Sequence, residues 1–173
     1  QYGVYVWDGM TFAEGVPDVT SFDEIAPEVT YYESYPVWTN VGDLAFAGSS
    51  PEDEHIQIYL WDGNFATNIS QNPNAHNGGP RWADNGYWAF VTFFSDEQSI
   101  FIRDQENNTV LSTDGQYIPA WSSTAGLIFC RRGSQRSNWV LSIWNGKEIV
   151  ELSEGGEILA QWQSGQETVC SSG

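Results

Sequence analysis

Histidine, the usual base of nucleophilic catalysis, is scarce in this chain, and its spacing matches no catalytic pattern. The chain has two histidines, His55 and His76, and both fall in polar segments that read as loops. A Ser-His-Asp triad needs a histidine beside an activated serine, and the Gly-x-Ser-x-Gly turn that would expose such a serine is absent. Zinc needs three or four His, Cys or carboxylate ligands at recognisable spacing, which is also missing. We therefore predict a protein that is not an enzyme and has no cofactor.

Carboxylates are abundant, and their positions favour structural roles. Asp8, Asp62 and Asp104 each end a strand-like segment at a turn, where an aspartate side chain accepts hydrogen bonds from backbone N–H groups. A facing pair of carboxylates, as in glycoside hydrolases, is the alternative for some of the acids. The run Glu52-Asp53-Glu54 leaves a bound calcium ion open, although no Asp-x-Asp-x-Asp-Gly loop accompanies it.

The charge of the chain limits its partners. The 173 residues carry a net charge of −17, so nucleic acid is excluded as a partner because its phosphates need clustered Lys and Arg. The sequence also lacks an apolar run of about 18 residues, which excludes direct membrane insertion. Residues 1–80 contain no Lys or Arg, whereas four of the six bases lie between residues 131 and 147. This asymmetry allows copies of the chain to associate through opposite charges.

A repeat of about 42 residues determines which elements must position these side chains. One motif occurs as Pro36-Val37-Trp38, Pro80-Arg81-Trp82 and Pro119-Ala120-Trp121, with a weaker copy at Ala160-Gln161-Trp162. A glycine and an apolar segment ending in Phe46, Phe90 or Phe129 follow the first three copies. The tryptophans are 44, 39 and 41 residues apart. Because these tryptophans recur in register, we expect them to pack between repeats and not to stack on sugars.

A second motif recurs within the same repeat. It reads Val4-Tyr5-Val6-Trp7-Asp8-Gly9 in its first copy and begins again at Ile58, Ile100 and Leu141. Its β-branched and aromatic residues running into a polar turn predict a strand and a tight turn, and a short outer strand follows. Four strands in about 42 residues correspond to one blade of a β-propeller.

The combined pattern resembles the WD-like propeller repeat of the TolB type. The copy Pro119-Ala120-Trp121-Ser122-Ser123 is similar to that family's Pro-x-Trp-Ser-Pro-Asp-Gly motif, with Ser123 in place of the family's proline. The resemblance covers nearly the whole chain and implies an all-β propeller. It does not imply one function, because such propellers serve in several kinds of protein.

We therefore predict one domain over residues 1–173, with four blades of four antiparallel strands. The expected repeats are residues 31–70, 71–112 and 113–156, and a fourth made from 1–30 with 157–173. In the fourth, N-terminal outer strands at residues 4–7 and 19–25 would pair with C-terminal inner strands at 159–162 and 167–170. The resemblance implies that this pairing closes the ring, which removes exposed strand edges. A part of a larger ring is the alternative, and the place of the insert at residues 14–33 stays open.

The candidate binding residues follow from this expected ring. Propellers commonly bind at the channel mouth, where the loops that lead into the innermost strands converge, and the residues expected there are Tyr35, His76, Arg81, Tyr117 and Gln161. A salt bridge to a nearby acid is the alternative role for Arg81. Cys130 and Cys170 fall at similar levels of adjacent repeats, so a disulfide between them is an expectation, worth about 3 kcal/mol.

These features favour a binding module that presents loops to a protein or peptide, located outside the cell or in the periplasm as a domain of a larger surface protein. A self-associating structural protein is the first alternative, based on the uneven charge. A carbohydrate-binding propeller is the second, with Tyr35 and Trp139 as candidate contacts because they have no role in the repeat.

Overall fold

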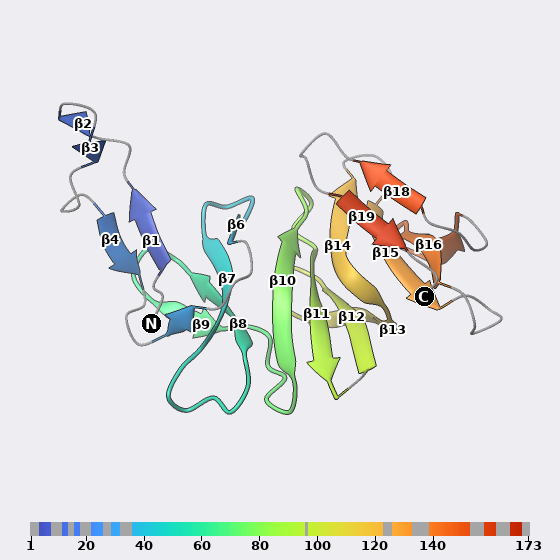
Figure 1. Ribbon diagram of the computed structural model, residues 1–173, viewed down its shortest axis with the longest axis horizontal. Coiled ribbons are helices and arrows are strands. Elements are labelled where there is room, and N and C mark those ends of the chain that lie inside the picture. The colour runs from blue at the N-terminus through green and yellow to red at the C-terminus, as the bar shows by residue number, and fades with distance from the viewer. Residues whose placement is uncertain are drawn as a thin grey trace.

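The computed structural model describes most of the chain. Up to residue 25 it describes the strand segments 4–7, 12–13, 16–17 and 22–25, and beyond them residues 29–31, 36–95, 97–122, 126–132, 139–152, 158–161 and 167–170. Side chains are described for residues 29, 36–95, 97–115, 119–122, 126–132 and 139–152. All regular structure in these residues is β, and every strand pair is antiparallel, as predicted (Figure 1).

Three sheets follow one another along the chain, and each has strands in four successive positions. Sheet one contains β7 (Leu44–Ser49), β8 (Gln57–Trp61) and β9 (Ala66–Asn68), and its first layer is divided between β5 (Thr30–Tyr31) and β6 (Val37–Trp38), which both pair with β7. Sheet two contains β10 (His76–Trp82), β11 (Trp88–Phe94), β12 (Glu97–Arg103) and β13 (Thr109–Asp114). Sheet three contains β14 (Gln116–Ser122), β15 (Gly126–Arg132), β16 (Trp139–Trp144) and β17 (Ile149–Glu151).

Successive side chains of a strand point to opposite faces of its sheet. One face of each sheet therefore packs against the preceding sheet and the other against the next. In sheet two, Trp88 and Phe90 pack against Ala47 and Ile58 of sheet one. The residues between them, such as Ala89 and Val91, face sheet three and pack against Leu127 and Phe129. Large side chains on one sheet thus meet small or branched ones on its neighbour and form the core between sheets.

The predicted inter-repeat packing of tryptophan is confirmed for Trp82 and Trp121 and is not seen for Trp38 among the described residues. Trp82 stacks on Trp88 of its own sheet with ring centroids 5.1 Å apart, and it packs against the cluster that contains Ala47 and Ile58 of sheet one. Trp121 packs edge-on against Trp144 and donates its indole N–H to the backbone oxygen of Arg81, in the first strand of the preceding sheet, at 3.1 Å. Trp38 differs, because its side chain is 54% exposed. Trp162 lies outside the described residues.

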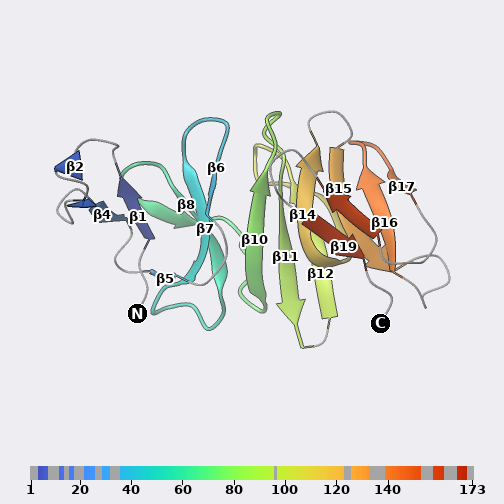
Figure 2. The same ribbon diagram turned by 45° about the horizontal axis from the view of Figure 1, so that its top comes forward.

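The ends of the chain form three strand pairs. β1 (Val4–Trp7) pairs with β4 (Phe22–Ile25), and β18 (Ile158–Gln161) pairs with β19 (Glu167–Cys170), close to the expected segments. β2 (Phe12–Ala13) pairs with β3 (Val16–Pro17), and the described strands of the insert at residues 14–33 are β3, β4 and β5. Figures 1 and 2 place β1 and β4 on the side of sheet one away from sheet two, while β19 contacts β14 and β15. The four-blade count and the closed ring stay predictions.

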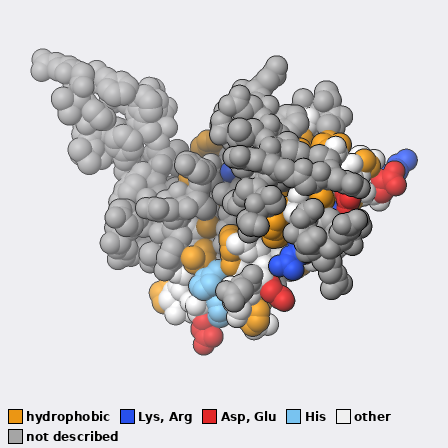
Figure 3. All heavy atoms as spheres, turned by 45° about the vertical axis from the view of Figure 1, so that its right-hand side comes forward, with side chains coloured by type: hydrophobic (Ala, Val, Ile, Leu, Met, Phe, Trp, Pro, Cys, Tyr) orange, Lys and Arg blue, Asp and Glu red, His pale blue; other side chains and the backbone are white. Residues whose placement is uncertain are grey.

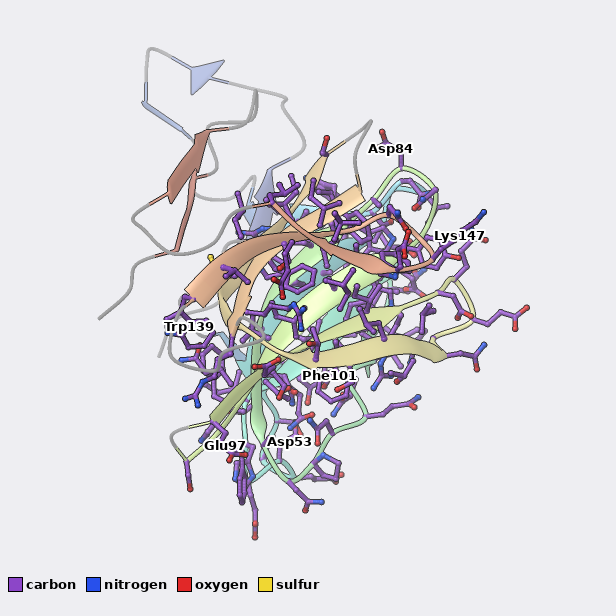
Figure 4. All side chains as sticks on the ribbon, turned by 90° about the vertical axis from the view of Figure 1, so that its right-hand side faces the viewer. Asp53, Asp84, Glu97, Phe101, Trp139 and Lys147 are labelled. Carbon is purple, nitrogen blue, oxygen red and sulfur yellow. The ribbon has the colours of Figure 1, made fainter. Side chains whose placement is uncertain are left out.

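The connections between strands define two ends of the molecule. We call the end with the tight turns 39–43, 62–65, 83–87, 104–108 and 145–148 the turn face, and the end with residues 50–56, 71–75 and 94–97 the link face. Figure 4 shows Asp84 and Lys147 at the turn face and Asp53 and Glu97 at the opposite end. A hydrogen bond from Asn40 Nδ2 to the backbone oxygen of Asp84, 3.2 Å long, joins the turn faces of sheets one and two.

Candidate binding site

The structure does not bring the predicted binding residues together in one place. His76 begins β10 and Arg81 is its penultimate residue, so the two are five positions apart along the strand, about 16 Å. Tyr117 lies on β14 and Gln161 on β18, but the side chains of both are outside the described residues, as is all of Tyr35. Of the two predicted residues whose side chains are described, His76 is exposed and lies on the link face, whereas Arg81 is buried.

The side chain of Arg81 is directed into the protein. It is 8% exposed, and its guanidinium donates to the backbone oxygen of Pro80 at 2.8 Å. The backbone oxygen of Arg81 accepts the indole N–H of Trp121. In the described arrangement Arg81 therefore supports the contact between sheets two and three.

His76 lies beside His55 on the link face. The two ring centroids are 4.8 Å apart, and Figure 3 shows both histidines together at the surface. The backbone N–H of Ile56 donates to Nδ1 of His76 at 3.1 Å, so Nδ1 bears no proton and its lone pair is occupied. Because neutral imidazole has only one such lone pair, this His76 conformation is suited to donating from Nε2 and not to binding a metal.

A buried polar network fixes the strand that begins with His76. Asn77, Gln57 and Ser70 are almost fully buried. The Asn77 amide donates to the backbone oxygen of Ala75 at 2.9 Å and to Gln57 Oε1 at 3.2 Å, and Ser70 Oγ donates to the same Gln57 oxygen at 2.7 Å. Satisfied buried networks of this kind are rigid. The network therefore holds the link between sheets one and two, and with it His76, in a defined position.

Two exposed phenylalanines lie at the end of β11, and the first of them is the cross-strand partner of His76. Phe93 pairs directly with His76 across β10 and β11, and Phe94 follows it at the end of β11 with its side chain 61% exposed. Phe93 is also exposed. We call His55, His76, Phe93 and Phe94 the link patch.

Sequence reasoning missed both phenylalanines, although a signal was present. Counted from the shared Phe of each repeat, Phe93 corresponds to Ser49 in sheet one and Arg132 in sheet three. An apolar residue where the other repeats are polar is not needed to build the strand. A comparison of the repeats residue by residue would have identified it.

The carboxylates of Asp62 and Asp104 stabilise turns of the fold. Asp62 Oδ1 accepts from the backbone N–H groups of Asn64 and Phe65 at 2.9 Å, and Asp104 Oδ1 accepts from those of Glu106 and Asn108. The N–H groups of Phe65 and Asn64 lower the pKa of Asp62 below its usual value, and Asn108 does so for Asp104. The predicted role as turn residues is confirmed for both. Asp8 lies outside the described residues.

Asp53, the central member of the acidic run 52–54, is engaged in a similar way. Its Oδ2 accepts from the backbone N–H and the hydroxyl of Ser50, each at 3.0 Å, and from the hydroxyl of Tyr59. Burial raises the pKa of Asp53, but the hydrogen bonds from Tyr59 and Ser50 outweigh burial, so the pKa lies below its usual value. Asp53 therefore fixes the link 50–56 as an ionised acceptor.

Two aromatic residues without a role in the repeat have intramolecular partners. Tyr87 packs edge-on against Trp144 with ring centroids 5.3 Å apart, and the guanidinium of Arg132 lies 5.7 Å from the ring centroid of Trp139. Of the remaining bases between residues 131 and 147, Arg131 forms an ion pair with Glu151 at 2.7 Å, and Arg136 lies outside the described residues.

Cys130 is disulfide-bonded and fully buried. It faces the side of sheet three that carries Leu141, and β19, which contains Cys170, lies against this sheet. The side chain of Cys170 is outside the described residues, so its pairing with Cys130 stays a prediction, with Cys170 the chain's other cysteine.

Within the described residues, no group of three or more His, Cys, Asp or Glu side chains is arranged to hold a metal ion. The described part of the chain also has no apolar helix of membrane-spanning length. Compared with protein-family models, with curated proteins and with solved structures, the chain shows no significant match.

Proposed function

We propose that this chain is a non-enzymatic binding module whose link patch binds a protein or peptide. The observation that carries the proposal is the exposure of Phe93 and Phe94 at the end of β11, where Phe93 pairs with His76 on β10, the strand that the Asn77 network holds. Apolar side chains that gather in one exposed patch, unlike single scattered ones, are typical of interaction sites. The nearby imidazole adds a hydrogen-bond donor that orients a backbone carbonyl or a polar side chain of the partner.

We further propose that the three sheets belong to a closed four-bladed ring of the TolB-like, WD-like type. The exposed Trp38 supports this proposal. Trp121 donates its indole N–H to the first strand of the preceding sheet, at Arg81, and the residue that corresponds to Arg81 before Trp38 in a closed ring is Gln161. Closure would bring β18 to Trp38, pair β19 with β1 and draw the link loops around one mouth.

A location outside the cytoplasm belongs to the same proposal. Disulfides persist in oxidising compartments, and Cys130 forms one. An extracellular or periplasmic domain of a larger surface protein fits this chemistry.

A selection from displayed random peptides on the immobilised chain tests the binding proposal. Peptides enriched on the native chain should bind Phe94→Ser about tenfold more weakly, because serine stands at the equivalent position 50 of sheet one. Val150→Ser, an exposed change on an outer strand, is the matched control and should leave the affinity unchanged.

Two results would overturn the proposal. One is that no peptide is enriched above a blank surface, or that the enriched peptides bind Phe94→Ser as tightly as the native chain. The other is steady-state turnover, in a panel of hydrolase substrates, that disappears when a single carboxylate is replaced.

A further inference from the structure

A second exposed apolar site lies on the turn face of sheet one, at the opposite end from the link patch. Val41 is 75% exposed and Phe65 is 74% exposed, the two highest values among the large hydrophobic side chains described. We call these two residues the turn patch. Neither side chain is buried in the core, and the sister turns carry polar residues at the same positions.

Hydrogen bonds show which residue of sheet two corresponds to Val41. In sheet one the backbone N–H of Thr39 donates to the backbone oxygen of Asp43 at 2.8 Å. In sheet two the N–H of Ala83 donates to the oxygen of Tyr87, also at 2.8 Å. These two turns are therefore built alike, and the position of Val41 is occupied by Asn85 in sheet two.

The same comparison holds for Phe65. The N–H of residue 62 donates to the oxygen of Phe65 at 3.3 Å, residue 104 donates to Asn108 at 3.0 Å and residue 145 donates to Glu148 at 3.2 Å. The closing residue of this turn is thus Phe65 in sheet one, Asn108 in sheet two and Glu148 in sheet three. Because polar residues close the same turn elsewhere, the fold does not require phenylalanine here.

The two turns lie next to each other. Leu44 and Trp61 are paired across β7 and β8, and the turns 39–43 and 62–65 begin directly beyond this pair at the end of the sheet. Val41 and Phe65 therefore belong to one edge of sheet one.

Acidic side chains surround the turn patch. Asp43 and Asp62 belong to the same two turns, and Asp84 lies in the neighbouring turn, which Asn40 joins to them by a hydrogen bond. Among the described residues of the turn face, the one base is Lys147 in sheet three, on the same end as Asp84 in Figure 4. Backbone N–H groups lower the pKa of Asp62, so its charge persists in mildly acidic solution. A partner that seats an apolar group here would meet negative charge on its flanks.

We propose that the turn patch is a second interaction surface, which binds a basic protein segment whose apolar side chain packs between Val41 and Phe65 while flanking Lys or Arg residues pair with Asp43, Asp62 and Asp84. The charge of the site selects this partner over an acidic peptide, and it disfavours anionic lipid and nucleic acid for the same reason. The surface uses none of the residues of the link patch, so one module would connect two partners.

Synthetic peptides with a central Leu or Phe flanked by lysines provide the probe, and fluorescence anisotropy measures their dissociation constants. The native chain should bind them, and the double variant Val41→Asn/Phe65→Asn should bind about tenfold more weakly. Asparagine occupies the equivalent positions 85 and 108, so this variant keeps the turn geometry. Asp43→Asn/Asp84→Asn should also weaken binding, and added salt should reduce the affinity of the native chain.

Controls separate this surface from the link patch. Peptides with a central serine or with flanking glutamates should not bind, and Phe94→Ser or Val110→Asn should leave the affinity unchanged. Equal affinity of the native chain and the Val41→Asn/Phe65→Asn variant overturns the inference, as does equal binding of the lysine and glutamate peptides or the absence of binding by lysine peptides. Any of these results leaves the proposal for the link patch standing, because that proposal depends on Phe94.

Discussion

At the scale of single residues, Arg103 shows how one departure from the repeat acquires a structural role. It occupies the position of Trp61 and Trp144, and its buried guanidinium donates to the backbone oxygens of Ile69, at 3.2 Å, and Ser70 in the preceding sheet. Burial lowers the pKa of Arg103. Arg103→Trp restores the residue of the sister repeats but removes the donor to the Ser70 oxygen and leaves the Ile69 oxygen with the Asn107 amide alone, so the free energy of unfolding should fall by about 2–4 kcal/mol in urea titrations. Unchanged stability would contradict this role, and the exposed Arg132→Met should cost less than about 1 kcal/mol.

Asp53 makes the stability of the molecule depend on pH. Its pKa is lowered in the folded chain from an ordinary value of 3.8, so its stabilising effect is complete above that value and is lost as the pH falls through the folded pKa. Asp53→Asn should therefore be less stable than the native chain at neutral pH, and the difference should narrow below about pH 4. Urea unfolding over this range measures it. A constant difference at all pH values would argue against the ionised Asp53, and Glu52→Gln is the exposed control.

At the scale of elements, the turns depend on backbone shape at individual glycines. Gly126 has φ +108°, and a Cβ atom there would lie 2.1 Å from the backbone oxygen of Trp144. Gly42 has φ +96° but open space around the same atom. Gly42→Ala should cost about 1–2 kcal/mol from backbone strain alone, whereas Gly126→Ala should cost several times more because β15 must move away from β16. Thermal unfolding distinguishes the two, and equal losses would contradict the described approach of these strands.

The elements themselves were largely predictable from the sequence, because the repeat fixes strand order, turn positions and the alternation of large and small residues. The divided first layer of sheet one was not, since Thr30–Tyr31 and Val37–Trp38 both pair with β7 through a contact distant in sequence. The candidate site was predicted only at His76. Phe94, Val41 and Phe65 are exposed because no other segment covers them in the described structure. A repeat pattern does not encode such tertiary contacts. Each of these residues nevertheless departs from its sister repeats, and that departure is visible in the sequence.

At the scale of the whole molecule, a disulfide holds sheet three. If Cys130 pairs with Cys170, it ties the last strand to the sheet it lies against, and reduction should lower the free energy of unfolding by about 3 kcal/mol. Peptide mass mapping without reductant should show the pair as one linked fragment, and Cys130→Ala should reproduce the loss. Two unlinked peptides would contradict the pairing.

The central claim at this scale is that the chain closes on itself and so gathers its link loops into a binding face. The most direct test is hydrogen exchange at the indole N–H of Trp38, observed by ¹⁵N NMR and assigned with Trp38→Phe. Closure predicts a slowly exchanging N–H, protected as the Trp121 N–H is by the backbone oxygen of Arg81. Light scattering at low and high salt should show a monomer in the same sample, which excludes closure through a second copy. Rapid exchange at Trp38 in a monomer would contradict the closed ring.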